Sequence, residues 1–347
     1  AIQFYTQGDY EKWKLENNDG KGYKMKYYKG LGTSTSKEFK EYFKEKKVVS
    51  FEHCQQDDEW IDQVFNKTKS DDRKQWLATY DRERYLDVQR KAISYKDFID
   101  NELIHYSKYD CERSIPSGID GFKLSQRKIL FSAFKKNLNQ EIKVAQFSGY
   151  VSEQSGYHHG EASLNGAIVN MAQDYVGSNN INLLMPNGQF GTRLQGGKDS
   201  ASERYIYTRL NRITRQLFKK EDELVLHYLD DDGLSVEPIY YVPIIPMILV
   251  NGALGIGTGF ATNIPCYNPK QLITIIKKKI KDDPNGMQYE DNYLVPYYKG
   301  FKGTITKVNE HKYIIFFDEN FLRISRNFLE INIHFANSLD ICGNLRT

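Results

Sequence analysis

The stretch GGKDSASERYIYTRLNRITR, Gly196–Arg215, decides how the rest of this sequence is interpreted. It places Arg204 directly before Tyr205 and adds three more arginines within the next ten residues. A tyrosine beside arginine suits phosphoryl transfer. Phenolate attack on a phosphodiester keeps the energy of the broken bond in a phosphotyrosine, from which the phosphodiester can be formed again. A phenol has a pKa of about 10 and needs positive charge or a base nearby, and the Arg204 guanidinium offers a phosphate a fixed fork of donors. The chain has 25 tyrosines, so spacing alone favours Tyr205 only weakly over Tyr207.

A basic segment surrounds this stretch. Residues 113–220 hold 15 Lys and Arg against seven Asp and Glu, a local charge of +8, whereas the whole chain has a net charge of +3. The remaining residues therefore sum to −5. A basic segment inside an otherwise acidic chain indicates a surface that binds a polyanion. A solvated surface would give the same charge pattern.

Two adjacent histidines, His158 and His159, precede a glycine and a predicted helix in GYVSEQSGYHHGEASLNGA. Adjacent side chains on an extended segment point apart, so we do not expect both to bind one metal ion. No cysteine or carboxylate lies at zinc spacing from them, and we predict no metal site in this chain. One histidine directed at a phosphate is the functional interpretation, and a structural histidine at a turn is the alternative.

Two glycine-rich stretches resemble nucleotide-binding loops but miss the required patterns. GTRLQGGKD has one residue too many before its Gly-Lys pair for a phosphate-binding loop, and Asp199 stands where that loop has Ser or Thr. NGALGIGTG has the wrong glycine spacing for a dinucleotide loop, and no acidic residue follows about 20 residues later. These glycines instead let the backbone approach another surface and leave Ile256 exposed. An exposed isoleucine can wedge between base steps of DNA, and a packed loop isoleucine is the alternative.

The residue pattern predicts a multidomain α+β chain. Apolar residues at helical spacing and charged runs predict helices over residues 57–65, 71–104, 124–138, 161–176 and 206–218. In residues 124–138 we expect Lys and Arg on the face opposite the apolar side chains. Residues 27–43 predict a strand, a glycine turn and a helix that Ser34 or Ser36 caps. From residue 237 onward, β-branched runs with Pro and Gly indicate a further α+β region.

Length and composition exclude some classes of protein. The 347 residues suffice for two or three domains. No stretch approaches the roughly 20 apolar residues that a membrane helix needs, and the most apolar run, residues 242–250, contains two prolines and is expected in the core. The four cysteines form no CxxC pair, which favours buried free thiols in a reducing compartment.

Six long motifs occur in a fixed order and together resemble the type IIA DNA topoisomerases, from about residue 20 to residue 310. They are KYYKGLGTS, RSIPSGIDGFKLSQRKIL, YHHGEASL, LLMPNGQFGTR, GGKDSASERYIYT and PIIPMILVNGALGIGTGFATNIP. The resemblance implies four parts: residues 1–47 as the C-terminal part of a TOPRIM domain, 48–105 as a helical linker, 106–236 as a winged-helix DNA breakage-reunion domain, and 237–347 as part of a tower domain. Because KGLGT precedes the winged helix in one chain, the sequence resembles the eukaryotic branch. Its Lys-, Asn- and Tyr-rich usage resembles enzymes of large cytoplasmic DNA viruses, such as African swine fever virus.

The resemblance also implies a role for individual residues. It makes Tyr205 the nucleophile, with Arg204 and His159 as its catalytic neighbours, His159 stabilising the phosphate. It makes Ile256 the residue that intercalates and bends the DNA. It adds DNA-binding residues on the basic segment, namely Arg113, Lys123, Arg127 and His158.

The implied activity is double-strand DNA breakage, passage and rejoining through a 5′-phosphotyrosyl intermediate by a homodimer, at an intracellular site in the nucleus or, for a viral enzyme, the host cytoplasm. The family uses Mg²⁺, held by an upstream Glu and a DxDxD cluster, and ATP, held in a separate domain. This sequence contains neither the acidic cluster nor the ATP-binding domain. A non-catalytic module that bends DNA is therefore the alternative function.

Overall fold

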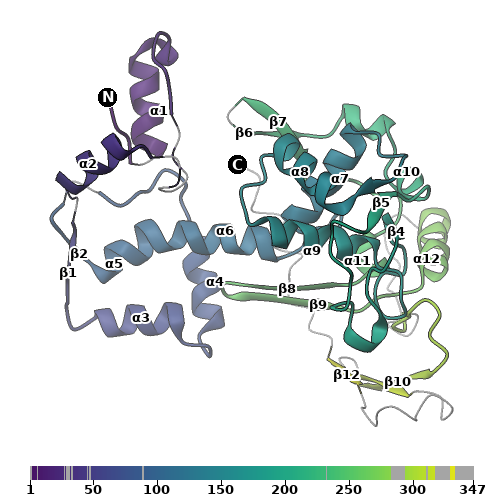
Figure 1. Ribbon diagram of the computed structural model, residues 1–347. Helices are drawn as coiled ribbons and strands as arrows, with labels where there is room; N and C mark the ends of the chain where they lie inside the picture. The colour runs from purple at the N-terminus through teal and green to yellow at the C-terminus, as the bar shows by residue number, and fades with distance from the viewer. Residues whose placement is uncertain are drawn as a thin grey trace. The chain divides into compact units, whose positions relative to one another are not determined.

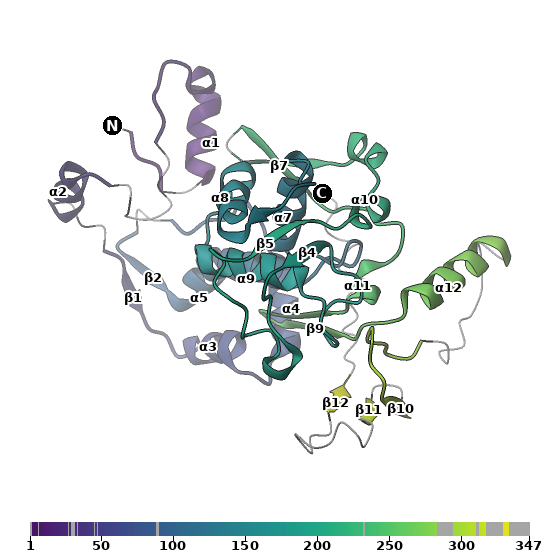
Figure 2. The same cartoon turned by 45° about the vertical axis from the view of Figure 1, so that its right-hand side comes forward.

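The structure, a computed structural model, describes residues 2–5, 7–26, 28, 32, 34–44, 46, 48–87, 90–231, 233–282, 294–309, 312–316 and 329–332. The chain divides into two compact units, Ala1–Asp110 and Cys111–Thr347. Figures 1 and 2 show their helices and strands. Each unit is described separately below.

The first unit consists mainly of short helices with one pair of parallel strands (Figure 1). Its helices and strands are α1 (Gln7–Glu16), η1 (Asn18–Gly20), α2 (Ser36–Lys44), β1 (Ser50–Glu52), α3 (Asp57–Phe65), α4 (Ser70–Ala78), β2 (Ala92–Ser94), α5 (Tyr95–Phe98), the π-helix η3 (Ile99–Leu103) and α6 (Ile104–Ser114), which runs across the division between the units. Strand β1 pairs with β2 in parallel, with Phe51 opposite Ile93.

Two local predictions for this unit are wrong in detail. Helix α2 is capped by Thr35, whose hydroxyl and amide pair with Glu38, rather than by Ser34 or Ser36. This Thr-x-x-Glu pattern is a capping box. The helix predicted over residues 71–104 stops at Ala78, and a new one begins only after Ser94, whose side chain accepts from the Asp97 amide. The KGLGT motif lies largely outside the described residues, as does the tail after residue 317 apart from β12.

The second unit opens with the element order of a winged helix, as predicted. Its elements are α7 (Leu124–Lys135), β3 (Ile142–Lys143), α8 (Val144–Ser155), α9 (Glu161–Ala172), β4 (Leu184–Asn187) and β5 (Tyr207–Leu210). The three strands form an antiparallel sheet in the order β3-β5-β4, and the three helices lie beside it (Figure 1). The loop between β4 and β5 carries Tyr205, so the predicted nucleophile stands at the entrance to the central strand.

The predicted helix over residues 206–218 is wrong, because its first part is strand β5. Ile206, Thr208 and Leu210 are buried, whereas Tyr207 and Arg209 are exposed or half-buried. This alternation has the period of a strand rather than of a helix. Only Thr214–Leu217 form a helix, the single turn α10.

The expectation of Lys and Arg on the face of α7 opposite its apolar residues is wrong for Arg127 and Lys128, whereas Lys135 and Lys136 are exposed. Arg127 and Lys128 are each 8% exposed and lie in ion pairs. Arg127 Nε donates to Asp120 Oδ2 at 2.8 Å, and Arg127 Nη2 donates to Asp120 Oδ1 at 3.1 Å. Lys128 Nζ donates to Glu237 Oε2 at 2.8 Å and also to the Ser155 carbonyl. Buried charges persist only when they are paired in this way.

The rest of the second unit is built from hairpins and one longer helix. Its elements are the 3-10 turns η4 (Arg193–Gln195) and η5 (Glu221–Leu224), β6 (Tyr228–Asp231), β7 (Leu234–Pro238), α11 (Met247–Val250), β8 (Ala253–Gly257), β9 (Phe260–Ile264), α12 (Pro269–Asp282), β10 (Thr304–Asn309), β11 (Lys312–Phe316) and β12 (Leu329–Asn332). The apolar run 242–250 is only partly in the core: Met247 and Val250 are buried, whereas Val242 and Ile244 are about half exposed. Among the described helices, none has the length and apolar character to cross a membrane.

The buried pair of Lys128 and Glu237 gives a stability prediction. Glu237→Gln removes the partner charge and leaves the Lys128 ammonium buried, so we expect the free energy of unfolding to fall by roughly 3–5 kcal/mol. Urea denaturation, followed by the shift in midpoint at constant slope, measures this loss. The matched control is Lys128→Met with Glu237→Leu, which removes both charges and should cost much less. Equal losses in the two variants would contradict an electrostatic role for the pair.

Candidate active site

Tyr205 lies on a turn that the first residues of α8 hold by backbone hydrogen bonds. The amides of Val144 and Ala145 donate to the carbonyls of Ile206 and Glu203 at 3.0 and 3.1 Å. The first amides of a helix have no partner within the helix, and here residues on either side of Tyr205 supply the acceptors. The Tyr205 amide also donates to the Ser202 carbonyl at 2.9 Å, which closes the turn.

The turn buries the neighbour of Tyr205 and exposes Tyr205 itself. Ile206 is 1% exposed and anchors the backbone in the core, whereas Tyr205 is 74% exposed. Gly188 leaves the room for Ile206, because a Cβ at Gly188 would lie 2.9 Å from the Ile206 side chain. The Tyr205 ring is thus presented to solvent from a fixed backbone position.

Exposure also separates Tyr205 from many other tyrosines of the chain. Burial raises the pKa of Tyr241 far above its ordinary value and raises that of Tyr267 to about 12, so neither phenol suits nucleophilic attack. The rival candidate Tyr207 is 37% exposed, half as much as Tyr205. The structure therefore adds a geometric reason to prefer Tyr205.

Arg204 is exposed beside Tyr205, and no hydrogen bond or ion pair joins its side chain to another described residue.

The preceding GTRLQGGKD loop is held by hydrogen bonds between its own residues. Thr192 donates to the Asp199 carboxylate from both its amide and its hydroxyl at 2.7 Å, and these hydrogen bonds hold the pKa of Asp199 below its usual value. Because Asp199 closes its own loop, the rejection of a phosphate-binding loop from the sequence agrees with the structure.

The two histidines point to different partners, as their adjacency predicts. His158 Nε2 lies 3.3 Å from Asp231 Oδ2 on β6. His159 Nδ1 lies 3.4 Å from Arg113 Nη1 at the end of α6, and its ring meets Tyr157 edge to face. The structure therefore brings together Arg113 and His159, which are 46 residues apart in sequence.

Lys123 and Arg127 have different environments although they are one turn apart at the start of α7. Partial burial lowers the pKa of Lys123, and this residue is among those that line a cavity of about 900 Å³. Arg127 is buried, and its donors are directed to Asp120 and to the Phe122 carbonyl. The prediction of Arg127 as a DNA contact therefore conflicts with its buried position, and the structure makes it a residue that holds the loop before α7.

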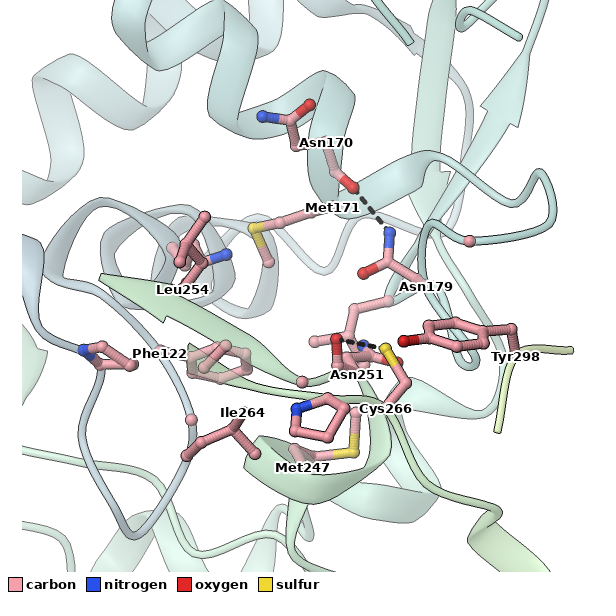
Figure 3. Close-up of a pocket in the computed structure, with 18 of the residues that line it drawn as sticks. Phe122, Asn170, Met171, Asn179, Met247, Asn251, Leu254, Ile264, Cys266 and Tyr298 are labelled. Carbon is pink, nitrogen blue, oxygen red and sulfur yellow. Dashed lines mark hydrogen bonds between the residues drawn. The ribbon is translucent and has the colours of Figure 1, made fainter. Parts of the chain in front are cut away.

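The cavity beside Lys123 has an apolar floor and polar amides on its wall (Figure 3). Met247 and Ile264 lie on its apolar side, whereas Met171 lies beside Asn170. Across it, Asn179 donates to the Asn170 carbonyl at 2.7 Å. Lys123 is the one predicted site residue among its lining residues, so this cavity is separate from the turn that carries Tyr205.

Ile256 lies on the hairpin of β8 and β9 and is 74% exposed. Its glycine neighbours face the opposite side of the strand, where a Cβ at Gly255 would overlap the Ser114 carbonyl and one at Gly257 would lie 3.2 Å from Cys111. The surface that the glycines approach closely is therefore the end of α6. Ile256 lies on the opposite, exposed side of the hairpin. NGALGIGTG forms this hairpin and not the strand-turn-helix of a dinucleotide site.

Two features of the site were missed by inference from the sequence. Asp231, the partner of His158, lies 73 residues from it. Gly156, which ends α8 in the left-handed conformation at φ 58°, is followed directly by the histidine segment. A glycine after a helical pattern is a signal for such a helix end, but nothing in the sequence marks Asp231.

Metal ligands and reactive thiols are not grouped at the site. Within the described part of the chain, no three His, Cys, Asp or Glu side chains are close enough to hold a metal ion. Cys54 is exposed, contrary to the expectation of buried thiols, whereas Cys266 is buried and its pKa is raised to about 11. Cys342 lies outside the described residues.

Comparison with known proteins identifies similar sequences across both units. A family model described as the A subunit of DNA gyrase/topoisomerase IV matches residues 113–320, and one described as the C-terminal associated domain of TOPRIM matches residues 1–111. DNA topoisomerase 2 of Arabidopsis thaliana is 53% identical over 313 residues, which cover 88% of this chain and 21% of that protein. DNA topoisomerase 2 top-2 of Caenorhabditis elegans is 48% identical over 344 residues, which cover 93% of this chain and 22% of that protein.

A solved structure is similar in fold as well as in sequence. It is the Plasmodium falciparum topoisomerase II DNA-binding, cleavage and re-ligation domain, with a TM-score of 0.74 and 48% identity. The similarity covers 90% of this chain and 42% of that one. The chain thus spans about a fifth of the length of the two relatives above and under half of this solved chain.

Proposed function

The chain belongs to the type IIA DNA topoisomerases, close to the eukaryotic topoisomerase 2 enzymes, and from that premise we propose that it is a DNA-cleaving core whose nucleophile is Tyr205. The observation that carries the proposal is the turn before β5. It combines an exposed tyrosine, an exposed arginine beside it, and a backbone fixed by the first amides of α8. A nucleophile must be accessible and also held in place, and this turn meets both requirements.

The proposed step is attack of the Tyr205 oxygen on a phosphorus atom of duplex DNA. The phenol loses its proton as the Tyr205 oxygen bonds to phosphorus and forms a 5′-phosphotyrosyl ester. The bond from phosphorus to the 3′ oxygen breaks, and that oxygen takes up a proton, so one proton is released and one is gained. Negative charge grows on the non-bridging oxygens as the bonds exchange, and the Arg204 guanidinium beside Tyr205 stabilises it. Reversal of the same step restores the DNA strand.

Arg113 and His159 form a second group of donors in this proposal. Their contact places a guanidinium and an imidazole side by side, an arrangement that binds phosphate oxygens through charge-assisted hydrogen bonds. Lys123 and His158 add further donors for the DNA backbone, whereas Arg127 supports the loop before α7. No described contact joins Tyr205 to Arg113 or His159, so their convergence on one phosphate is part of the proposal.

Ile256 is proposed to hold the DNA bent. Its apolar side chain is exposed on a hairpin whose other side is packed against the end of α6. Such a supported side chain can enter between base steps, and the unstacking cost of a few kcal/mol is offset by the larger contact surface of bent DNA.

We also propose, from membership of the family, that the enzyme passes DNA strands as a homodimer, depends on Mg²⁺ and uses ATP. The described residues do not provide a metal-ligand cluster, so we derive no step through a metal ion. An intracellular location follows from DNA as the proposed substrate. The compartment, the viral source and the internal boundaries at residues 47, 105 and 236 stay predictions.

The first test concerns Tyr205 in the full-length enzyme. Tyr205→Phe should abolish the covalent DNA adduct while leaving the dissociation constant for DNA within about twofold, because only one exposed hydroxyl is lost. The measurement is trapping with Mg²⁺ and DNA, followed by mapping of the modified peptide. Tyr207→Phe, two residues away, is the matched control and should still form the adduct.

Two results would contradict this assignment. An adduct mapped to another tyrosine would remove Tyr205 from the mechanism. DNA binding without any adduct in the wild-type enzyme would instead favour the alternative, a module that bends DNA without cutting it.

The second test concerns the basic surface. Binding of duplex DNA should weaken steeply with salt, the logarithm of the binding constant falling by about 0.9 per phosphate neutralised for each tenfold rise in salt. Lys123→Ala should lower that slope by roughly one unit with little change in sequence preference. Lys12→Ala, an exposed lysine of α1, is the control with equal loss of charge. Binding that does not respond to salt would refute the polyanion surface.

The third test concerns Ile256. Ile256→Ala should reduce both the bend angle and the rate of cleavage, because the wedge between base steps is lost while the fold is not. Energy transfer between dyes at the two DNA ends reports the bend. Val308→Ala truncates another exposed β-branched side chain, on β10, and should leave the bend unchanged. If the Ile256 variant bends DNA as far as the wild type does, the side chain is not a wedge.

A further inference from the structure

The hairpin of β6 and β7 contacts the turn between α8 and α9, which carries both histidines of the site. Figure 1 shows the hairpin beside α8. Its β7 strand supplies Glu237, which accepts from Lys128 at 2.8 Å, and the same ammonium donates to the carbonyl of Ser155, the last residue of α8. Glu237 is 1% exposed, so the base of the hairpin is joined to the end of α8 through a buried ion pair.

The other strand of the hairpin reaches the residues that follow. Asp231 on β6 places its carboxylate 3.3 Å from His158 Nε2. The same carboxylate fills the space where a Cβ of Gly156 would lie. Asp231 therefore fits against the glycine that ends α8 and contacts the first histidine with the same carboxylate oxygen.

The histidine segment is short, so its two histidines are coupled through the backbone. It runs from Gly156 to Gly160, the residue before α9. Tyr157 is buried, and Ser152 both accepts from its amide and donates to its carbonyl. With Tyr157 fixed, the direction of the His158 side chain restricts the backbone that presents His159 to Arg113.

We propose that Asp231 is a positioning residue of the cleavage site, acting through His158 to hold the histidine segment in its productive conformation. The inference rests on the proposed function, because it assigns a role in the cleavage of DNA. Asp231 touches neither Tyr205 nor DNA in this proposal. Its effect is on the arrangement of the donors and not on the affinity for the substrate.

If the Asp231 carboxylate acted instead by repelling DNA phosphates, a different experimental result would be expected. A negative charge beside a DNA-binding histidine would repel phosphate, and its removal would then tighten DNA binding without slowing cleavage. A positioning role requires the reverse pattern, a slower cleavage step at saturating DNA with little change in affinity. The two roles are therefore separated by measuring the rate and the dissociation constant on the same variants.

The experiment uses the full-length enzyme with Mg²⁺ and a short DNA duplex. Asp231→Ala should slow formation of the Tyr205 adduct at saturating DNA by about two- to fivefold, the range that a partly exposed polar contact of a carboxylate supports. Asp231→Asn retains an acceptor for His158 and should slow it less. The dissociation constant for DNA should stay within about twofold of the wild type in both variants.

Asp230→Asn is the matched control, because it removes the same charge one residue away. The Asp230 side chain accepts from the Gly233 amide within the hairpin turn rather than from a histidine, and asparagine keeps an acceptor there. This variant should cleave at the wild-type rate. Adding Asp231→Ala to a His158→Ala enzyme should have no further effect, since the two residues act in one path.

Several outcomes would overturn the inference. Unchanged cleavage by Asp231→Ala, tighter DNA binding at an unchanged rate, equal slowing by Asp230→Asn, or full additivity with His158→Ala would each do so. If Asp231→Ala fails to fold, Asp231→Asn alone decides by the same comparison with Asp230→Asn. A wild-type enzyme that forms no adduct refutes the proposed function itself and this inference with it, a result distinct from those on the variants.

Discussion

The proposed site depends on two backbone hydrogen bonds, from the amides of Val144 and Ala145 to the carbonyls on either side of Tyr205. A helix begins with amides that have no partner within the helix, and a loop needs acceptors that hold it in place. In this protein the first amides of α8 donate to carbonyls of the loop before β5, so the helix start gains acceptors and the loop is held in place. The arrangement also places the backbone of the turn that carries Tyr205 at the N-terminus of α8, the positive end of the helix dipole.

Buried ion pairs, and the further hydrogen bonds of their side chains, join α7 to α8 and to more distant parts of the second unit. Arg127 holds the loop before α7 through Asp120, and Asp120 also accepts from the Tyr241 amide, 121 residues away. Lys128 joins α7 to the end of α8 and to β7. A buried charge without its partner is strongly unfavourable, so these pairs tolerate few alternative arrangements of the helices. They explain how a basic segment can supply structural contacts as well as a surface for a polyanion.

Inference from the sequence succeeded where one local pattern decides the structure, and it failed where distant segments or a choice among neighbouring residues decide it. The helices over α7 and α9 follow from periodic apolar residues, and the separation of His158 from His159 follows from their adjacency. Strand β5 was expected to be a helix because its pairing partners, β3 and β4, are not visible in a short window of sequence. The cap of α2 was misplaced by one residue, since the choice among Ser34, Thr35 and Ser36 depends on which one reaches Glu38. Arg127 shows the same limit, because its charge suggests a surface whereas its partner Asp120 keeps it inside.

In the hairpin of β8 and β9, one side of strand β8 packs against the end of α6 and the other side faces solvent. Side chains alternate across a strand, so Gly255 and Gly257 face the end of α6 while Leu254 and Ile256 face solvent. A larger residue at either glycine would push the hairpin off α6 and withdraw its support. An unsupported hairpin could not transmit force to a bent duplex, because the strand would move instead of the DNA. The glycines are thus a condition for the proposed wedge, although neither of them would touch the DNA.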